Sequence, residues 1–132
     1  MEEICSYLFV YGSLLDDKNK FAIYLKDNCT FYADGKLTGK LYDIGEYPGA
    51  ILQTEDANYV HGKVFLINKP QALFEQLDDY EGYGETQPQP NEFIRVLADI
   101  AVEAELLRCW TYLYNLPVEE FKQIVSGNYF DQ

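Results

Sequence analysis

The stretch from residue 29 to residue 67 limits the possible folds most strongly, because it is rich in glycine and in residues that favour β-strands. Its strand-like runs cover residues 30–32, 36–42, 50–52 and 59–67. The pair Asp34-Gly35 between the first two runs predicts a tight turn, so we expect these runs to form an antiparallel hairpin. Outside this stretch, further strands are predicted over about 4–12, 92–98 and 104–114.

Apolar residues at helical spacing predict a helix that starts at Pro70 and is stopped by Gly82 and Gly84. Its apolar face is formed by Leu73, Phe74, Leu77 and Tyr80. Shorter helices are predicted over about 17–26 and after Pro117, the latter carrying Val118, Phe121 and Ile124. We therefore expect a single α+β domain over residues 1–132, built as a small mixed, mostly antiparallel sheet or barrel with short helices at its periphery.

The formal net charge of −12 argues against nucleic-acid and anionic-membrane partners, because the ten Lys and Arg residues are scattered rather than clustered. The sequence contains no run of about 18 apolar residues, and Met1-Glu2-Glu3 lacks the basic start of a signal peptide. The three widely separated cysteines suit a reducing compartment. We expect a cytoplasmic protein that is a monomer or a small homo-oligomer.

Several catalytic chemistries lack the residues they need. His61 is the only histidine and Ser13 lies in no G-x-S-x-G sequence, which argues against a serine hydrolase. One histidine, and cysteines without ligand spacing, also argue against a zinc enzyme. The neighbouring acids Asp78 and Asp79 are expected to face solvent. We therefore expect neither a metal nor a cofactor.

The segment Leu8-Phe9-Val10-Tyr11-Gly12-Ser13-Leu14 ends a strand abruptly at a glycine and a hydroxyl residue. Without a Cβ, Gly12 lets the main chain approach a ligand closely. If a helix begins near Asp17, the free amides of the turn point outward and favour an anion. The segment is therefore either an anion-binding turn or a plain connection between a strand and a helix.

Glu81 follows Leu77 by four residues and Phe74 by seven, so it lies on the apolar stripe of the predicted helix. Burial and the negative end of the helix dipole both raise the pKa of a carboxyl in this position. A glutamate with such a raised pKa suits proton transfer near neutral pH. The alternative is an acid at a frayed helix end that turns out to water.

Six short motifs occur in order along nearly the whole chain. They read Tyr11-Gly12-Ser13-Leu14, Tyr47-Pro48-Gly49-Ala50, Leu77-Asp78-Asp79-Tyr80-Glu81-Gly82-Tyr83, Phe93-Ile94-Arg95, Trp110-Thr111-Tyr112-Leu113-Tyr114 and Ser126-Gly127-Asn128-Tyr129. In order and spacing this set resembles the γ-glutamylcyclotransferase-like family, most closely its small bacterial members, which are often grouped with plant avirulence-induced proteins.

The resemblance implies a compact β-barrel flanked by helices, with one cavity at the barrel mouth. It implies that Tyr11, Gly12, Ser13 and Leu14 bind the amino-acid end of a small γ-glutamyl substrate, and that Glu81 is the catalytic acid/base. In such a reaction the substrate's α-amine attacks its own γ-carbonyl, which releases 5-oxoproline and a free amine. The nucleophile belongs to the substrate, so the reaction needs no cofactor.

Three further residues are candidates for substrate binding: Tyr47, Arg95 and Tyr112. Arg95 either pairs with a carboxylate in the barrel or extends to water from an edge strand, and the two tyrosines either line the cavity or pack in the core. Residues 16–20 depart from relatives that carry Gly and Asn after the turn, so the leaving amine stays open. The alternative function is a non-catalytic small-molecule-binding or regulatory protein that uses the same cavity.

Overall fold

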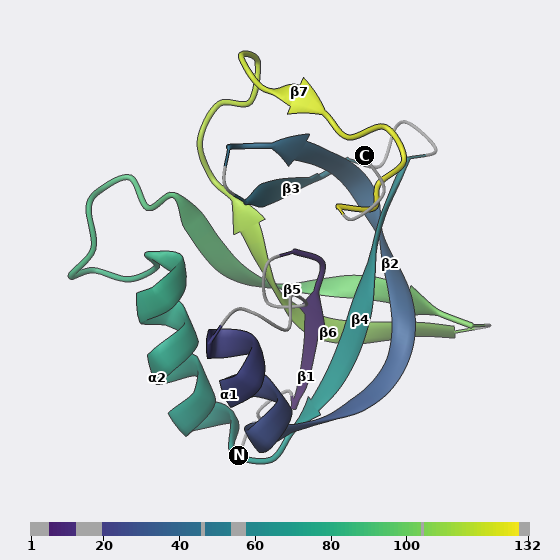
Figure 1. Ribbon diagram of the computed structural model, residues 1–132, viewed down its shortest axis with the longest axis vertical. Helices are drawn as coiled ribbons and strands as arrows, with labels where there is room; N and C mark the ends of the chain where they lie inside the picture. Colours follow the sequence, from purple (N-terminus) through teal and green to yellow (C-terminus); the bar gives the residue numbers. More distant parts are fainter. Residues whose placement is uncertain (1–5, 13–19, 46, 54–57, 104, 130–132) are drawn as a thin grey trace.

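The computed structural model describes residues 6–12, 20–45, 47–53, 58–103 and 105–129 (Figure 1). The predicted helix over 17–26 therefore lies partly outside the described residues. The elements, in chain order, are β1 (Tyr7–Val10), α1 (Lys20–Asn28), β2 (Cys29–Asp43), β3 (Pro48–Leu52), β4 (Tyr59–Ile67), α2 (Pro70–Glu81), β5 (Phe93–Val102), β6 (Glu105–Tyr114) and β7 (Lys122–Gln123).

Five strands close into a barrel in the order β2-β4-β1-β6-β5, and closure comes from the pairing of β2 with β5. At this seam Lys36 lies opposite Ala101 and Leu37 lies opposite Ile100. Neighbouring barrel strands are antiparallel except β1 and β6, which are parallel. The expected mixed, mostly antiparallel barrel flanked by short helices is confirmed.

The hairpin expected at Asp34-Gly35 is wrong, because both residues lie inside the continuous strand β2. Asp34 is opposite Lys63 and Gly35 is opposite Gly62 in the ladder with β4. A Cβ at Gly35 would lie 2.6 Å from the Cγ2 atom of Ile100. This glycine therefore permits close packing between β2 and β5 where the barrel closes, and it does not make a turn.

The helix expected after Pro117 is also wrong. The N–H of Phe121 donates to the carbonyl of Val118 at 3.0 Å, and the chain then extends as β7 alongside the end of β2. The N–H of Ile124 donates to the carbonyl of Leu41 at 2.7 Å. The backbone hydrogen bonds of this segment are thus supplied by a distant strand, while its apolar side chains still pack against the core.

Strand β1 is buried on both faces, and its alternation divides the core into two clusters. Leu8 and Val10 belong to a cluster on the helix side, together with residues of α1 and α2. Phe9 and Tyr11 belong to the cluster inside the barrel. Both helices therefore cover one side of the barrel next to β1, as Figure 1 shows.

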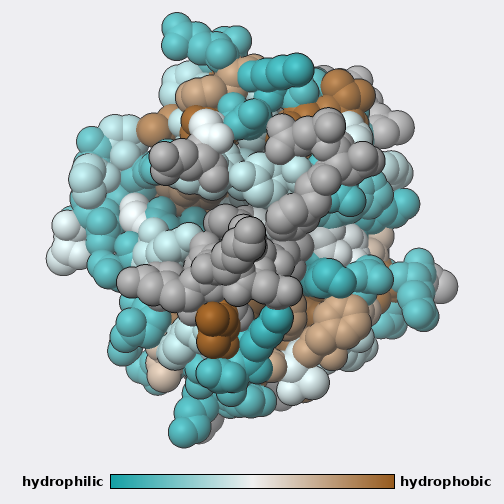
Figure 2. Space-filling view, in the orientation of Figure 1, coloured by the Kyte–Doolittle hydropathy of each residue, from teal (hydrophilic) through white to brown (hydrophobic). Residues whose placement is uncertain are grey.

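The surface agrees with the acidic composition. Hydrophilic residues cover most of the face in Figure 2, where hydrophobic residues lie in small separate groups. Neither helix of the described part of the chain is long and apolar enough to cross a membrane.

Candidate active site

A cavity of about 230 Å³ lies at one end of the barrel. Because β6 runs parallel to β1 and antiparallel to β5, the carboxyl ends of β1 and β6 meet the amino end of β5 there. The end of α2 and the start of β3 complete the walls. The described residues that line it are Phe9, Val10, Tyr11, Gly12, Tyr47, Pro48, Tyr80, Glu81, Glu92, Phe93 and Tyr112.

The cavity brings together most of the residues predicted from the sequence. Tyr11, Gly12, Tyr47, Glu81 and Tyr112 all line it. The remaining candidates are Arg95, which is not among the lining residues, and Ser13 and Leu14, which lie outside the described residues. Their proposed contacts with a substrate stay predictions.

Glu81 is delivered to the cavity by the last turn of α2. Gly82 follows it in the left-handed conformation, with φ of 74°, and ends the helix. The N–H of Tyr83 donates to the carbonyl of Asp78 at 2.8 Å, which closes this C-terminal turn. The helix end is therefore fixed, and the alternative of a frayed end with Glu81 in water does not hold.

Burial raises the pKa of the Glu81 carboxyl to about 7, and the charges of Glu92 and Asp78 add to this effect. No hydrogen bond or ion pair links the Glu81 carboxyl to another residue in the described part of the chain. With a pKa near 7, the acid and the carboxylate are both well populated at neutral pH. Glu81 can therefore accept a proton and return it.

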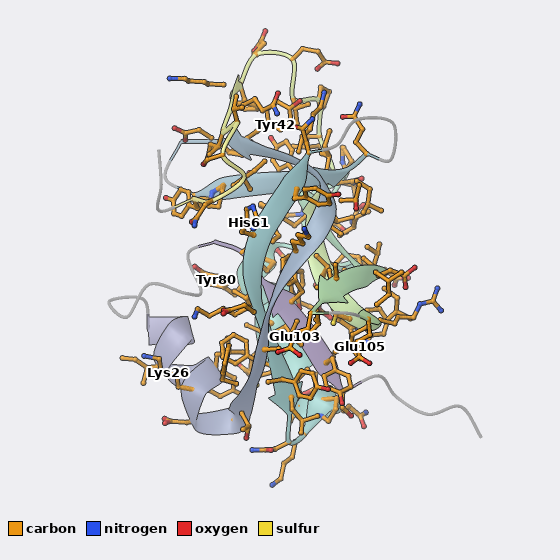
Figure 3. The ribbon with its side chains drawn as sticks, turned by 90° about the vertical axis from the view of Figure 1, so that its right-hand side faces the viewer. Lys26, Tyr42, His61, Tyr80, Glu103 and Glu105 are labelled. Atoms are coloured by element: carbon orange, nitrogen blue, oxygen red, sulfur yellow. The ribbon has the colours of Figure 1, made fainter. Side chains whose placement is uncertain are left out.

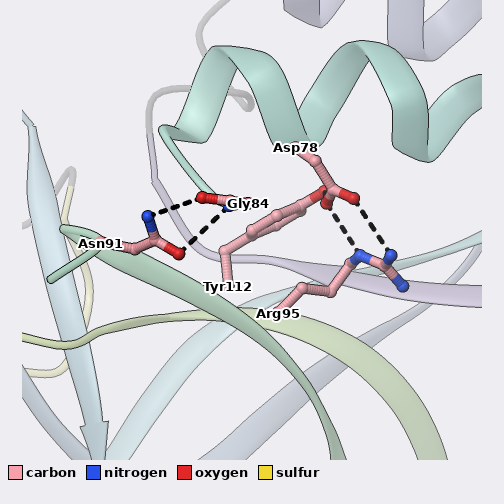
Figure 4. A network of polar contacts seen from close by, with 5 residues as sticks. All are labelled: Asp78, Gly84, Asn91, Arg95 and Tyr112. Atoms are coloured by element: carbon pink, nitrogen blue, oxygen red, sulfur yellow. Dashed lines mark hydrogen bonds and ion pairs between the residues drawn. The ribbon is translucent and has the colours of Figure 1, made fainter. Parts of the chain in front are cut away.

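Asp78 was expected to face solvent, and this prediction is wrong. Its carboxylate accepts hydrogen bonds from Nε and Nη2 of Arg95, at 2.8 and 3.1 Å, and from the Tyr112 hydroxyl at 2.7 Å (Figure 4). Arg95 and Tyr112 lie opposite each other on β5 and β6, so together they present three donors to one acid. The expectation failed because helical spacing alone does not show what a neighbouring sheet offers.

Arg95 is packed between aromatic rings, with its guanidinium 4.2 Å from the centre of the Phe74 ring and 4.5 Å from that of Trp110. Burial by itself would lower the pKa of Arg95, but the hydrogen bonds and charge of Asp78 outweigh it and raise the pKa. Of the two alternatives left open for Arg95, the structure shows the pairing with a carboxylate. In this arrangement Arg95 fastens α2 to the barrel.

Tyr11 joins three strands at the cavity wall. Its hydroxyl donates to the carbonyl of Tyr112 at 2.5 Å and accepts from the N–H of Ala50 at 3.2 Å. Burial raises the pKa of Tyr11, and the charge of Glu81 raises it further, so the phenol keeps its proton. The hydroxyl thus orders the cavity wall, of which Tyr11 is part.

Gly12 makes room for another part of the wall. A Cβ at this position would lie 2.7 Å from Cγ of Pro48, the first residue of β3. In the described residues, the absence of a side chain therefore lets β3 approach the end of β1. Gly12 also lines the cavity, and its expected approach to a ligand stays a prediction.

Glu92 is the cavity residue that sequence reasoning missed. The hydroxyl of Tyr47 donates to Oε2 of Glu92 across the cavity wall. The loop before Glu92 is held by Asn91, whose side-chain amide accepts from the N–H of Gly84 and donates to its carbonyl, both at 3.1 Å (Figure 4). A loop residue has no periodic pattern, so the only signal was an acid two residues after Pro90 and directly before a strand.

Two other observations limit the chemistry of the site. His61 is exposed on β4 and is not among the residues lining the cavity (Figure 3). Within the part of the chain that the structure describes, no three His, Cys, Asp or Glu side chains are grouped so as to hold a metal ion. The ionisable side chains among the described lining residues are carboxyl groups and phenols.

Sequence comparison places this chain in a known family. The family described as gamma-glutamyl cyclotransferase, AIG2-like matches residues 8–131. The gamma-glutamylcyclotransferase family protein YtfP of Escherichia coli K12 is 29% identical over 126 residues, which cover 95% of this chain and 96% of that protein.

Solved structures agree with this match. The solution structure of E. coli ytfP has a TM-score of 0.63 at 27% identity, covering 95% of this chain and 96% of that one. An AIG2-like protein from Mus musculus shares the fold, with a TM-score of 0.68 at 20% identity, covering 88% of this chain and 81% of that one. YkqA from Bacillus subtilis also shares it, with a TM-score of 0.69 at 22% identity, covering 94% of this chain and 39% of that one. The chain belongs to the gamma-glutamyl cyclotransferase, AIG2-like family.

Proposed function

We propose that this protein is a γ-glutamylcyclotransferase-type enzyme that acts on a γ-glutamyl amine or peptide. The observation that carries the proposal is Glu81: its pKa is about 7, it has no partner among the described residues, and it lines the cavity. Family membership supports the same reaction class. The products are 5-oxoproline and a free amine.

The reaction balances without water or a cofactor. The Glu81 carboxylate takes one proton from the substrate's α-ammonium group, and the neutral nitrogen attacks the γ-carbonyl carbon to form a five-membered ring. The protonated Glu81 then gives its proton to the amide nitrogen as the carbon–nitrogen bond to the leaving amine breaks. The ring nitrogen still carries two hydrogens, and it passes one of them as a proton to the released amine, which leaves as an ammonium ion. Glu81 ends as it began.

The cavity and the acid contribute separately to the rate. Walls formed by strands on several sides favour the folded conformer of a small substrate, and well-oriented intramolecular reactions reach effective molarities of roughly 10⁵ M or more. A positioned base adds about 10²- to 10⁴-fold. Loss of Glu81 should therefore abolish most turnover while leaving the shape of the cavity intact.

The test is to incubate the protein with γ-glutamyl amines, γ-glutamyl dipeptides and γ-glutamyl-ε-lysine, and to measure 5-oxoproline by mass spectrometry. Product is expected with the wild type and about 10²- to 10⁴-fold less with Glu81→Gln. Glu75→Gln, exposed on the same helix, is the matched control and should keep the wild-type rate. Saturable binding without product from any compound would instead identify a binding or regulatory protein.

A further inference from the structure

The cavity contains two acidic side chains and, among the described lining residues, no basic one. Its charged members are Glu81 and Glu92, and the charge of Glu92 acts on Glu81 strongly enough to raise the pKa of Glu81. The nearby cation Arg95 is bonded to Asp78 and lies outside the lining. Such a cavity favours a ligand that brings a cationic group.

The two cavity glutamates are held differently. Glu92 accepts a hydrogen bond from Tyr47, whereas Glu81 has no partner among the described residues. Burial raises the pKa of Tyr47, and the hydrogen bond to Glu92 raises it further, so the phenol stays protonated and remains a donor. The Tyr47 ring is itself packed against Phe93, with ring centres 5.8 Å apart.

Because of this difference, the two acids are suited to different roles. A carboxylate that a phenol holds in place by a hydrogen bond keeps acceptor positions for a second donor, so it is suited to bind a cation. A carboxyl without such a donor, and with a raised pKa, is suited to accept a proton. The cavity thus offers one acid for binding and another for proton transfer.

We propose that Glu92, positioned by Tyr47, binds the α-ammonium group of the γ-glutamyl substrate while Glu81 exchanges its proton. This inference rests on the function proposed above. The ammonium group donates one N–H to Glu92 and another to Glu81. After Glu81 takes its proton, the neutral amine still donates to Glu92, and this remaining bond directs the new lone pair toward the γ-carbonyl carbon.

The test measures binding of matched ligands by calorimetry in a Glu81→Gln background, which prevents turnover. One ligand is a γ-glutamyl alkylamide, and the other is the glutaryl alkylamide, which lacks only the α-amino group. With Glu92 present, the glutaryl ligand should bind roughly ten- to a hundredfold more weakly, as expected for hydrogen bonds to charged groups. With Glu92→Gln added, this ratio should fall close to one.

Two further variants complete the cycle. Tyr47→Phe should give an intermediate ratio, because Glu92 keeps its charge and loses its orientation. Glu85→Gln, an exposed acid in the same loop, should leave the ratio unchanged. A ratio that Glu92→Gln does not alter, or equal weakening of both ligands, would overturn the role of Glu92.

The outcomes for the two proposals are distinguishable. If wild-type protein binds γ-glutamyl alkylamides but makes no 5-oxoproline, the catalytic proposal fails, and the binding ratio still tests Glu92. If neither ligand binds to any variant, both proposals fail.

Discussion

Two groups of polar residues meet at the end of α2, and they differ in how their charges are balanced. Asp78 is bonded to Arg95 and Tyr112, so its negative charge is matched by a cation and three donors. Glu81, three residues later, has no such partner in the described chain. The balanced group holds α2 against the barrel, and the unbalanced acid is the one to which the proposed function assigns proton transfer.

The largest effect should come from breaking the balanced group. Arg95→Met leaves Asp78 partly buried without its cation, and we expect a loss of about 3–5 kcal/mol in the free energy of unfolding, measured with urea. Arg108→Met is the control, because its ion pair with Asp99 is exposed and 4.0 Å long. That change should cost at most about 1 kcal/mol. Equal losses would remove the distinction between the two pairs.

For Glu81 we expect the opposite effect on stability, namely that removing its charge makes the protein more stable. The pKa of Glu81 rises from 4.5 to about 7 on folding, so the native state binds more protons between these pH values and stability falls as the pH rises across them. Glu81→Gln should therefore be more stable than the wild type at pH 8, by up to about 3 kcal/mol, with little difference near pH 4. Urea unfolding at both pH values checks this. A less stable Gln variant at pH 8 would contradict it.

Tyr11 is linked to both groups, since its hydroxyl donates to the carbonyl of Tyr112 and the residue lines the cavity together with Glu81. Tyr11→Phe leaves the N–H of Ala50 without its partner, and we expect a loss of about 1–2 kcal/mol in stability. Thermal unfolding measures the loss. Tyr129→Phe, which lies outside the lining residues, is a comparison variant, and a larger loss there would argue against a special role for Tyr11.

The smallest expected effect concerns the two acids of the cavity, Glu81 and Glu92. The charge of Glu92 contributes to the raised pKa of Glu81, so Glu92→Gln should move the acidic limb of the pH–rate profile from near pH 7 toward lower pH. The measurement is the pH dependence of kcat/KM for 5-oxoproline formation. A limb that stays in place would mean that Glu92 does not affect the ionisation of Glu81.

Local patterns in the sequence predicted much of the fold. The run 59–67 forms β4 over the same residues, and the helix from Pro70 ends at Gly82 as expected. Position on the apolar stripe also placed Glu81 correctly at a buried helix end. These features depend on residues close together in the chain, where periodicity and capping carry the information.

The predictions were wrong where contacts with distant strands determine the local structure. Asp34-Gly35 has the composition of a turn, but pairing with β4 and packing on Ile100 keep it extended. Asp78 was expected in solvent because Arg95 is seventeen residues away, and Glu92 has no pattern at all. Local patterns therefore identified the site residues of one helix and one strand end, while the candidates Tyr47 and Tyr112 come from other parts of the chain and also line the cavity.

Strand β2 pairs with β3, β4, β5 and β7, so it connects early and late parts of the chain. Its seam with β5 joins Lys36 to Ala101 and cannot form until a long segment has been brought back, which makes folding depend on contacts between distant residues. The cavity likewise has walls from parts of the chain as far apart as Tyr11 and Tyr112. Its formation during folding should therefore also depend on contacts between distant residues.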